Sequence, residues 1–317
     1  MNKITKESIE SAHQLITPYI HHTPILSSKQ INNILGCELF FKCENFQKVG
    51  AFKSRGAVNA VFSLNKAQLK NGVCTHSSGN HAQALARAAL LKNIPAYIVM
   101  PENAPKVKVN AVRDYGGIIH FCKATLEARE STLARVISQT NATEIHPYDN
   151  FKIIEGQATA AKEVFSELNK IDFIIAPVGG GGLLAGTALA NFYFGENTKV
   201  IAAEPKNADD ALRSFRAGQI IPSENPNTIA DGLLTSLGER NFPIIQKYVS
   251  DIHTANEDQI KKAMQLIWER MKIVVEPSAA VTLAIILANP DFFKGKKIVL
   301  ILSGGNVDLE RINHILF

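Results

Sequence analysis

The chain has 317 residues, 46% of them hydrophobic, which is enough for two domains with full apolar cores. Its 34 basic and 29 acidic residues leave a net charge of +5, and no run of basic residues is longer than Lys-Lys. Because the charge is scattered, we expect no nucleic-acid partner.

The chain also gives no sign of export or membrane insertion. Its amino end lacks the apolar core of a signal peptide, and the longest apolar run, 279–288, is too short to span a bilayer. The four cysteines form no C-x-x-C pair, and each lies in or beside an apolar run. Buried free thiols are typical of a reducing compartment, so we expect a soluble, cytoplasmic protein without a membrane partner. These cysteines are Cys37, Cys43, Cys74 and Cys122.

Helices and strands are predicted to alternate along the first half of the chain. A helix is expected over 6–20, a second ends at Gly36 behind the cap residue Ser28, and a strand over 37–42 leads toward Lys53. The remaining elements of this half are a helix from Lys53 to about 69, strands over 73–76, 96–100 and 118–121, and helices over 82–91, 106–115 and 126–140.

The second half repeats the alternation. A continuous apolar strand over 173–178 ends in four glycines, and a last strand over 297–302 ends in Ser303. The other elements are helices over 153–168, 183–194, 209–217, 257–272 and 278–288, a strand over 200–203, an extended loop over 218–238 and a final helix to the C-terminus. This order predicts a parallel α/β architecture with sites at the carboxyl ends of strands.

Lys53 is the first candidate for chemistry. It follows a glycine-bearing loop and begins a helix, with the flat apolar ring of Phe52 beside it and Gly50 permitting close backbone approach. A lysine in a partly apolar pocket has a lowered pKa and can form a Schiff base with a carbonyl. An exposed lysine on a charged face is the alternative, and three other glycine-rich turns argue against it.

The first of these turns is the uninterrupted run of Gly179, Gly180, Gly181 and Gly182 between a strand and a helix. Backbone N–H groups exposed at the positive end of a helix suit a phosphate. The spacing fits neither the dinucleotide-binding nor the P-loop pattern. Close packing of the helix on the sheet is the alternative. It needs only one or two glycines, so we favour the phosphate site.

The other two turns carry polar side chains at helix starts. The turn over 77–81, Ser-Ser-Gly-Asn-His, has one serine more than helix capping requires, so its donors could hold a carboxylate. Asn80 in this turn could donate to a phenolate oxygen, whereas His81 alone is more typical of a structural histidine. The turn over 303–306, Ser-Gly-Gly-Asn, is explained by capping when it is taken alone.

Three carboxylates lie close together in the sequence at Glu204, Asp209 and Asp210. Oxygen ligands of this kind suit magnesium or calcium. Asp209 and Asp210 are equally suited to begin a helix, so a metal site and a helix start stay open as even alternatives.

Four segments, in order along the chain, resemble the fold type II pyridoxal-phosphate enzymes, whose fold is tryptophan synthase β-like. They are Gly50-Ala51-Phe52-Lys53-Ser54-Arg55-Gly56-Ala57, Ser77-Ser78-Gly79-Asn80-His81-Ala82-Gln83-Ala84, Pro177-Val178-Gly179-Gly180-Gly181-Gly182-Leu183 and Leu302-Ser303-Gly304-Gly305-Asn306. The branch that looks nearest contains serine racemase and the serine/threonine dehydratases. The resemblance implies two three-layer domains with parallel sheets. The large, cofactor-binding domain would span 1–70 and 150–317, and a small mobile domain would span 71–149.

The resemblance also implies how these segments hold pyridoxal 5'-phosphate. Lys53 would carry it as a Schiff base, with Phe52 beside its ring. Asn80 would bond the phenolate oxygen, the four glycines would bind the phosphate, and Ser303 would face the pyridine nitrogen. Because a hydroxyl does not force protonation of that nitrogen, the ring would be a weak electron sink, suited to β-elimination or reprotonation.

Ser78 is implied to be catalytic beside Lys53, because the racemase branch carries serine where typical threonine dehydratases carry alanine. Racemisation needs a group on each face of a planar carbanion, and Lys53 would serve one face and Ser78 the other. A role limited to capping the helix and binding the carboxylate is the alternative. The implied substrate-binding residues are Ser77, Ser78, Asn80, His81, Arg129 and Asp231.

Three further partners follow from the same resemblance. A divalent cation (magnesium, calcium or manganese) would bind Glu204, the backbone carbonyl of Ala208 and Asp210. ATP would act as an activator, and the residues at matching positions are Gln83, Tyr115 and Asn306. The enzyme is expected to be a homodimer that acts on a small amino acid.

The predicted activity is racemisation of serine together with dehydration of L-serine or L-threonine to a keto acid and ammonia. A threonine dehydratase, or a threo-3-hydroxyaspartate ammonia-lyase without significant racemisation, is the alternative. A β-replacement enzyme, which typically has threonine in place of His81, and a cofactor-free phosphate-binding module have less support. Tyr148, where asparagine or phenylalanine is commoner, leaves the substrate preference open. With no regulatory domain before Phe317, feedback control by an end product is not expected.

Overall fold

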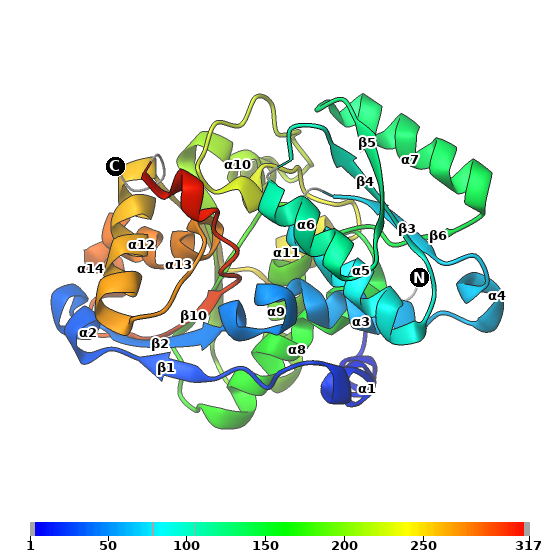
Figure 1. Cartoon of the computed structure of the whole chain (residues 1–317). Coiled ribbons are helices and arrows are strands. Elements are labelled where there is room, and N and C mark those ends of the chain that lie inside the picture. The colour runs from blue at the N-terminus through cyan, green and yellow to red at the C-terminus, as the bar shows by residue number, and fades with distance from the viewer. Residues whose placement is uncertain (1–3, 78, 105, 314–317) are drawn as a thin grey trace.

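The computed structural model describes residues 4–77, 79–104 and 106–313. Its strands are β1 (Ile25–Ser27), β2 (Glu38–Cys43), β3 (Val73–His76), β4 (Ala96–Pro101), β5 (Ile118–Cys122), β6 (Thr143–Glu144), β7 (Phe173–Pro177), β8 (Lys199–Pro205), β9 (Asp251–Ala255) and β10 (Lys297–Leu302). They form a six-stranded sheet in the order β1-β2-β10-β7-β8-β9 and a four-stranded sheet in the order β5-β4-β3-β6 (Figure 1). Every pair is parallel except β1 with β2.

The helices connect these strands and cover both faces of each sheet. They are α1 (Lys6–Ile16), α2 (Lys29–Leu35), α3 (Lys53–Phe62), α4 (Lys66–Leu69), α5 (Asn80–Lys92), α6 (Lys106–Asp114), α7 (Leu126–Thr140), α8 (Phe151–Glu167), α9 (Gly182–Phe194), α10 (Asp210–Ala217), α11 (Asn241–Tyr248), α12 (Glu257–Met271), α13 (Pro277–Ala288) and α14 (Pro290–Phe293). Among the described helices, none combines the length and the apolarity that a membrane span requires.

The six-stranded sheet is the middle layer of three. In β7, Phe173 and Ile175 face a core built with α2, α12 and α13, whereas Ile174 and Ala176 face a core built with α8, α9 and α11. Successive residues of a strand point to opposite faces, so a strand buried on both faces reads as a continuous apolar run. This is why the sequence pattern predicted β7 so well.

The four-stranded sheet is also covered on both faces. Val73 and Ile98 face a core shared with α3, α5 and α6, and Cys74 and Val99 face α7. Helix α3 packs against both α5 and α8, so it lies between the two sheet units (Figure 1). The predicted α/β class with parallel sheets in three layers is confirmed, while the domain boundaries at 70 and 150 stay predictions.

Three predicted helices differ from the structure by more than two residues at one end. The helix expected over 6–20 ends at Ile16, because Pro18 lacks the N–H that an α-helix needs and lies in a 3-10 turn. The helix from Lys53 ends at Phe62, and Asn65 then caps the separate helix α4. At the carboxyl end the described residues form a 3-10 turn, Leu309–Arg311, and the predicted final helix extends beyond the described residues.

Other elements were not predicted at all. Strands β1 and β6 have three and two residues, too few to show a period. Strand β9 lies at the sheet edge with only Ile252 and Ala255 buried, so it lacks the apolar run of the central strands. Helix α11 was missed as well.

Candidate functional site

Lys53 lies where two of the predicted motif loops meet. It is the first residue of α3, and the loop before it pairs with the turn after β10. Ala51 forms a β-bridge with Gly304, and the Phe52 N–H donates to the Ser303 carbonyl at 3.0 Å. Ser303 itself is buried. Residues 250 positions apart in the sequence are therefore neighbours at the carboxyl end of the central strand β10.

The side chain of Lys53 is partly buried, and its Nζ lies 5.1 Å from the ring centroid of Phe52. Nζ donates a hydrogen bond to the carbonyl of Pro147 at 2.8 Å. Burial lowers the pKa of Lys53 to about 8, and the Glu276 carboxylate opposes the shift. An amine with such a pKa is deprotonated far more often at neutral pH than an ordinary lysine, as a nucleophile or base requires.

Two residues further on, Arg55 anchors α3 in a buried cluster of charges. Its guanidinium donates to both carboxylate oxygens of Glu44 at 2.7 and 2.8 Å, and to both oxygens of Glu163 at 2.6 and 2.8 Å. Lys42 donates to Glu163 at 2.6 Å. The charges of Arg55 and Lys42 balance those of Glu44 and Glu163, and His13 Nε2 also lies 3.4 Å from Glu163 Oε1. These contacts fix the start of α3, and with it Lys53, to β2 and α8.

Asn80, the first residue of α5, lies in a chain of hydrogen bonds. Its Nδ2 donates to both oxygens of Glu276 at 2.9 and 3.2 Å, and its Oδ1 accepts from Asn306 Nδ2 at 2.8 Å. The same Asn306 nitrogen donates to the Val49 carbonyl at 2.8 Å. Burial, and next the charge of Asp231, raises the pKa of Glu276 to about 7. The 77–81 and 303–306 turns therefore meet through their asparagines.

The glycine loop, residues 179–182, follows β7 and begins α9. A Cβ added to Gly180 would lie 2.4 Å from the ring of Tyr148, and Gly181 has a φ of +91°, so close packing requires glycine here. Close packing, the alternative reason given above for these glycines, is therefore confirmed for Gly180 and Gly181. Among the described residues, however, none accepts a hydrogen bond from the backbone N–H groups of 179–182. The loop is therefore able to bind an anion as well.

The 77–81 turn is described in part, because Ser78 lies outside the described residues. Ser77 Oγ accepts from the Gly79 N–H at 3.3 Å. His81 is buried, and its Nε2 lies 3.1 Å from the Ile145 carbonyl, so Nε2 carries the proton. Burial lowers the pKa of His81 well below its ordinary value, and the ring is neutral. Its Nδ1 is a buried acceptor that no described residue uses.

Arg129 in α7 lies near the same turn. Its Nε is buried and finds no hydrogen-bond partner among the described residues. Burial, and next the charge of Arg129, lowers the pKa of His76, the last residue of β3 before the turn. Arg129 therefore brings a positive charge to the turn that is expected to bind a carboxylate.

His146 and Tyr148 flank Pro147 beside Lys53, and the sequence did not predict either of them as part of the site. His146 Nδ1 accepts the backbone N–H of Asp149 at 2.9 Å, so its proton is on Nε2, and burial lowers its pKa to about 4. The rings of His146 and Tyr148 meet edge-on with centroids 4.6 Å apart. Pro147 between them accepts the hydrogen bond from Lys53.

Asp231, predicted to bind substrate, forms an ion pair with Lys108. Lys108 lies in α6 of the four-stranded unit, and Asp231 lies in a 3-10 turn within the loop over 218–238. The pair therefore joins the two sheet units near Glu276, whose pKa both charges influence.

The predicted metal ligands come together at the end of β8. Glu204 and Asp210 are buried, as is Ala208 between them. Glu204 accepts the backbone N–H groups of Ala211 and Leu212 at 2.8 and 2.9 Å, and Asp210 Oδ2 has no partner among the described residues. Burial raises the pKa of Glu204 to about 8 and that of Asp210 to about 6. In the described part of the chain no three His, Cys, Asp or Glu side chains gather, so a cation here would also need backbone oxygen.

The three residues predicted to bind a nucleotide differ in their surroundings. Asn306 bonds to Asn80, Gln83 is buried in α5 about one turn beyond Asn80, and Tyr115 follows α6 and is partly buried. The nucleotide site stays a prediction.

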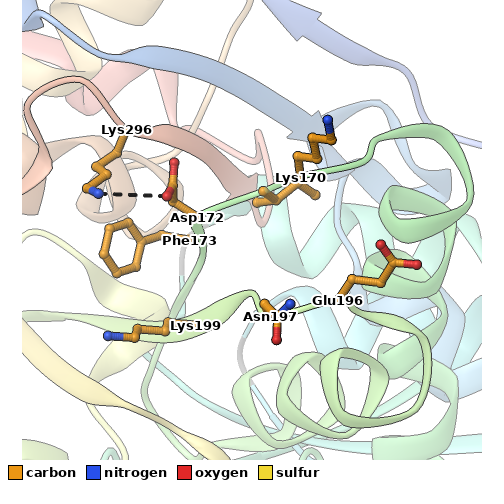
Figure 2. Close-up of a pocket in the computed structure, with 8 residues that line it drawn as sticks. Lys170, Asp172, Phe173, Glu196, Asn197, Lys199 and Lys296 are labelled. Carbon is orange, nitrogen blue, oxygen red and sulfur yellow. Dashed lines mark ion pairs between the residues drawn. The ribbon is translucent and has the colours of Figure 1, made fainter.

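A cavity of about 370 Å³ opens at the opposite end of the six-stranded sheet, where β7, β8 and β10 begin. Figure 2 shows that the charged ends of Lys170, Lys199 and Glu196 point in different directions. Lys296 lies 3.8 Å from Asp172. Because the charges do not converge on one point, this cavity is not the candidate active site.

Sequence reasoning missed Glu276, Pro147 and Lys108. The Glu-Pro pair at 276–277 before an apolar stretch is a recognisable helix start, which could have drawn attention to this carboxylate. Pro147 contributes a backbone carbonyl, which no side-chain pattern reveals. Lys108 looks like one more surface lysine until α6 is packed against the loop that contains Asp231.

The chain is similar to several known proteins over nearly its whole length. It is 51% identical to a serine racemase of Dictyostelium discoideum, covering 100% of this chain and 99% of that protein. It is 49% identical to a β-hydroxyaspartate dehydratase of Paracoccus denitrificans (strain Pd 1222), with 97% and 98% covered. A solved maize serine racemase superposes with a TM-score of 0.94 at 45% identity, covering 97% of this chain and 95% of that one.

The family described as pyridoxal-phosphate dependent enzyme matches residues 16–304. This range contains Lys53, the glycine loop 179–182 and Ser303, and the fold brings Ser303 next to the start of α3 although it lies 250 positions after Lys53. The chain therefore belongs to the pyridoxal-phosphate dependent enzymes.

Proposed function

We propose that this enzyme racemises serine and dehydrates L-serine and L-threonine to a keto acid and ammonia. The position of Lys53 carries the proposal, because its partly buried amine has a pKa near 8 and lies among the turns predicted to bind the cofactor and the substrate. The full-length similarity to a serine racemase supports the choice of reaction.

The residues around Lys53 fit pyridoxal phosphate. Lys53 would hold it covalently, and the N–H groups of 179–182, which donate to none of the described residues, would receive its phosphate. One amide hydrogen of Asn80 can be shared between the two Glu276 oxygens, which leaves the other for a ring oxygen. Ser303 would offer a hydroxyl to the ring nitrogen, which favours elimination and reprotonation over transamination.

When bound, the cofactor supplies an electron sink that makes the α-hydrogen of an amino acid acidic. Lys53, once its amine is free, takes that proton, and a base acts best when its pKa lies near the working pH. Phe52 beside Nζ limits the access of water. The 77–81 turn would hold the substrate carboxylate. Loss of the β-hydroxyl leads to the keto acid and ammonia, and return of the proton to the opposite face gives the enantiomer.

A dehydratase of 3-hydroxyaspartate is the second candidate. Arg129 favours it, because a guanidinium whose Nε has no partner among the described residues could bind a second carboxylate of the substrate. The similarity to a β-hydroxyaspartate dehydratase points the same way.

Product analysis distinguishes these reactions. The purified enzyme would be incubated with L-serine, D-serine, L-threonine and 3-hydroxyaspartate, and keto acid, ammonia and enantiomer would be measured. D-serine from L-serine supports the first proposal. Keto acid from 3-hydroxyaspartate without any serine enantiomer supports the second, and no reaction with any of the four refutes both.

Ser78→Ala is expected to abolish racemisation and D-serine elimination while L-serine dehydration remains. Loss of a general base typically costs about 10²–10⁴-fold, and here the loss would affect one face only. A serine that merely binds and caps would affect both enantiomers alike, mainly through KM. The rates with each enantiomer decide the question, and D-serine formation at nearly the wild-type rate would contradict the two-base mechanism.

We also propose a divalent cation on Glu204, Asp210 and the Ala208 carbonyl. Two buried carboxylates with raised pKa values support it, as does Asp210 Oδ2, which has no hydrogen-bond partner in the described part of the chain, because a cation would stabilise both charges. Magnesium, calcium or manganese should raise the melting temperature, and chelation should lower it. Glu204→Gln should remove the response. A melting temperature that changes with neither metal nor chelator would contradict this site.

The remaining partners are proposed on the resemblance. ATP would bind near Gln83, Tyr115 and Asn306, and a titration that leaves the rate unchanged would exclude it as an activator. We further propose a cytoplasmic homodimer with a large domain over 1–70 and 150–317 and a small mobile domain over 71–149. Light scattering of the purified protein tests the dimer.

A further inference from the structure

The hydrogen bonds around Asn80 fix the direction of its amide. A backbone carbonyl only accepts, so Asn306 must turn its Nδ2 toward Val49. That nitrogen also reaches Asn80, which must therefore present its oxygen to Asn306 and its Nδ2 to Glu276. Glu276 is thus the last acceptor in this series of hydrogen bonds. A carboxylate accepts through either oxygen, so it suits this position whatever the precise tilt of the amide.

The backbone is built to bring Glu276 to this position. Glu276 is the N-cap residue of α13, and its N–H donates to the Gly304 carbonyl at 3.0 Å. A Cβ on Gly304 would lie 2.7 Å from Glu276 Oε1 and 3.2 Å from Asn80 Nδ2. Glycine at 304 is therefore required for the contact between Glu276 and Asn80. The 303–306 turn therefore leaves room for the contact between Glu276 and Asn80, in addition to the predicted contact of Ser303 with the ring nitrogen of the cofactor.

Glu276 interacts electrostatically with three charged groups from different elements. Lys53 at the start of α3 is stabilised as a cation by the Glu276 carboxylate. Asp231 raises the pKa of Glu276, and Lys108 of α6 lowers it. Burial is the largest of the influences on Glu276. A charge held in such a place acts strongly on its neighbours, because little water screens it.

We propose that Glu276 is a positioning residue of the active site, which holds Asn80 so that one amide hydrogen is left for the ring oxygen of the cofactor. The charge of the Glu276 carboxylate also favours the cationic form of Lys53. The inference rests on the proposed function in that it takes Asn80 to face the cofactor. Glu276 itself takes part in no bond-breaking step.

Two substitutions separate the two effects. Glu276→Gln keeps an oxygen that accepts from Asn80 but removes the charge, whereas Glu276→Ala removes both. Cofactor retention, measured by equilibrium dialysis, should weaken about 10-fold or more in Glu276→Ala and little in Glu276→Gln, because a hydrogen bond to a charged group has about this worth. Wild-type retention by Glu276→Ala would overturn the role in positioning.

The pH profile reports the charge. With Glu276→Gln, the acid limb of kcat should move down by about one pH unit, because the Lys53 amine, which is free only when substrate is bound, loses the carboxylate that favours its cationic form. Glu155→Gln is the matched control: Glu155 is a buried carboxylate of α8 that pairs with Lys152 outside this cluster. Its profile should follow the wild type. An unshifted limb in Glu276→Gln would overturn the role of the charge.

A double-mutant cycle tests whether Glu276 acts through Asn80. Glu276→Ala and Asn80→Ala would be measured singly and together for cofactor retention. If Glu276 acts through Asn80, the double variant should lose little more than Asn80→Ala alone. Additive losses would show that Glu276 acts independently of Asn80 and would overturn the proposal.

A stability measurement needs no cofactor chemistry. The pKa of Glu276 is raised from 4.5 to about 7, so the native state keeps its proton over a range where the unfolded chain loses it. The free energy of unfolding of the wild type should therefore fall as the pH rises from about 4.5 to about 7. Glu276→Gln has no proton to lose at this position, so it should not show this decrease. The difference in melting temperature between Glu276→Gln and the wild type should therefore rise from about pH 4.5 to about pH 7. Melting temperatures that change with pH in the same way in both proteins would contradict the raised pKa of Glu276. A wild type that binds no cofactor would refute the proposed function and leave this result intact.

Discussion

Lys53→Ala is expected to lose the covalent hold on the cofactor and at least about 10⁴-fold in kcat for every substrate. The variant lacks the nucleophile that attaches the cofactor and the base that takes the α-proton, so two contributions disappear together. Wild-type protein should be yellow, and borohydride should fix the cofactor to one peptide. Mass spectrometry should find the adduct on Lys53 and no adduct in the variant.

Lys48→Ala provides the matched control for this experiment. Lys48 belongs to the same loop and is partly buried, but its side chain has no part in the arrangement around Pro147 and Glu276. It should keep the colour, the adduct and the activity. An adduct on a different lysine of the wild type would show that α3 does not present the attachment site.

Arg55→Met is expected to have the largest effect on stability. The substitution leaves Glu44 and Glu163 buried, and among the described residues Lys42 is then the one lysine or arginine paired with either of them. Breaking a buried ion pair in this way typically costs about 3–5 kcal/mol, a large share of the roughly 5–15 kcal/mol by which a domain is stable. The midpoint of urea unfolding should fall strongly, or the variant should fail to accumulate as a folded protein.

Lys296→Met tests whether burial causes the difference. Lys296 and Asp172 are paired at 3.8 Å with both side chains close to half exposed, and such a pair contributes about 0–1 kcal/mol. The unfolding midpoint of this variant should stay near that of the wild type. An equal loss in both variants would mean that the cluster around Arg55 is no stronger than a surface ion pair.

The motif loops could be predicted because each carries a local signal. In the sequence, Lys53, the glycines of 179–182 and Ser303 each come after a predicted strand, at or near the start of a predicted helix, and parallel topology brings such loops to one edge. Strand β10 was predicted at its observed bounds for a similar reason, since a buried strand reads as an apolar run. Local pattern and global fold agree at these positions.

The contacts that complete the site could not be predicted, because they join residues far apart in the sequence. Glu276 meets Asn80 across 196 positions, and Lys108 meets Asp231 across 123. Neither pair leaves a periodic or spaced pattern. Tyr148 was noticed only as a departure from the family, and its packing over Gly180 depends on the fold. The role of Ser78 stays a prediction, since the residue lies outside the described part of the chain.

The order of strands has a consequence for how the protein is made. The four-stranded sheet uses a continuous stretch, 73–144, whereas β10 must insert between β2 and β7, which precede it by more than 250 and 120 residues. During synthesis the smaller sheet has all its strands long before the larger one does. The larger sheet therefore waits with the edges of β2 and β7 exposed until β10 arrives. We expect the nascent chain to depend on chaperones in this interval, and the cofactor to find no complete site before the turn over 303–306 has folded.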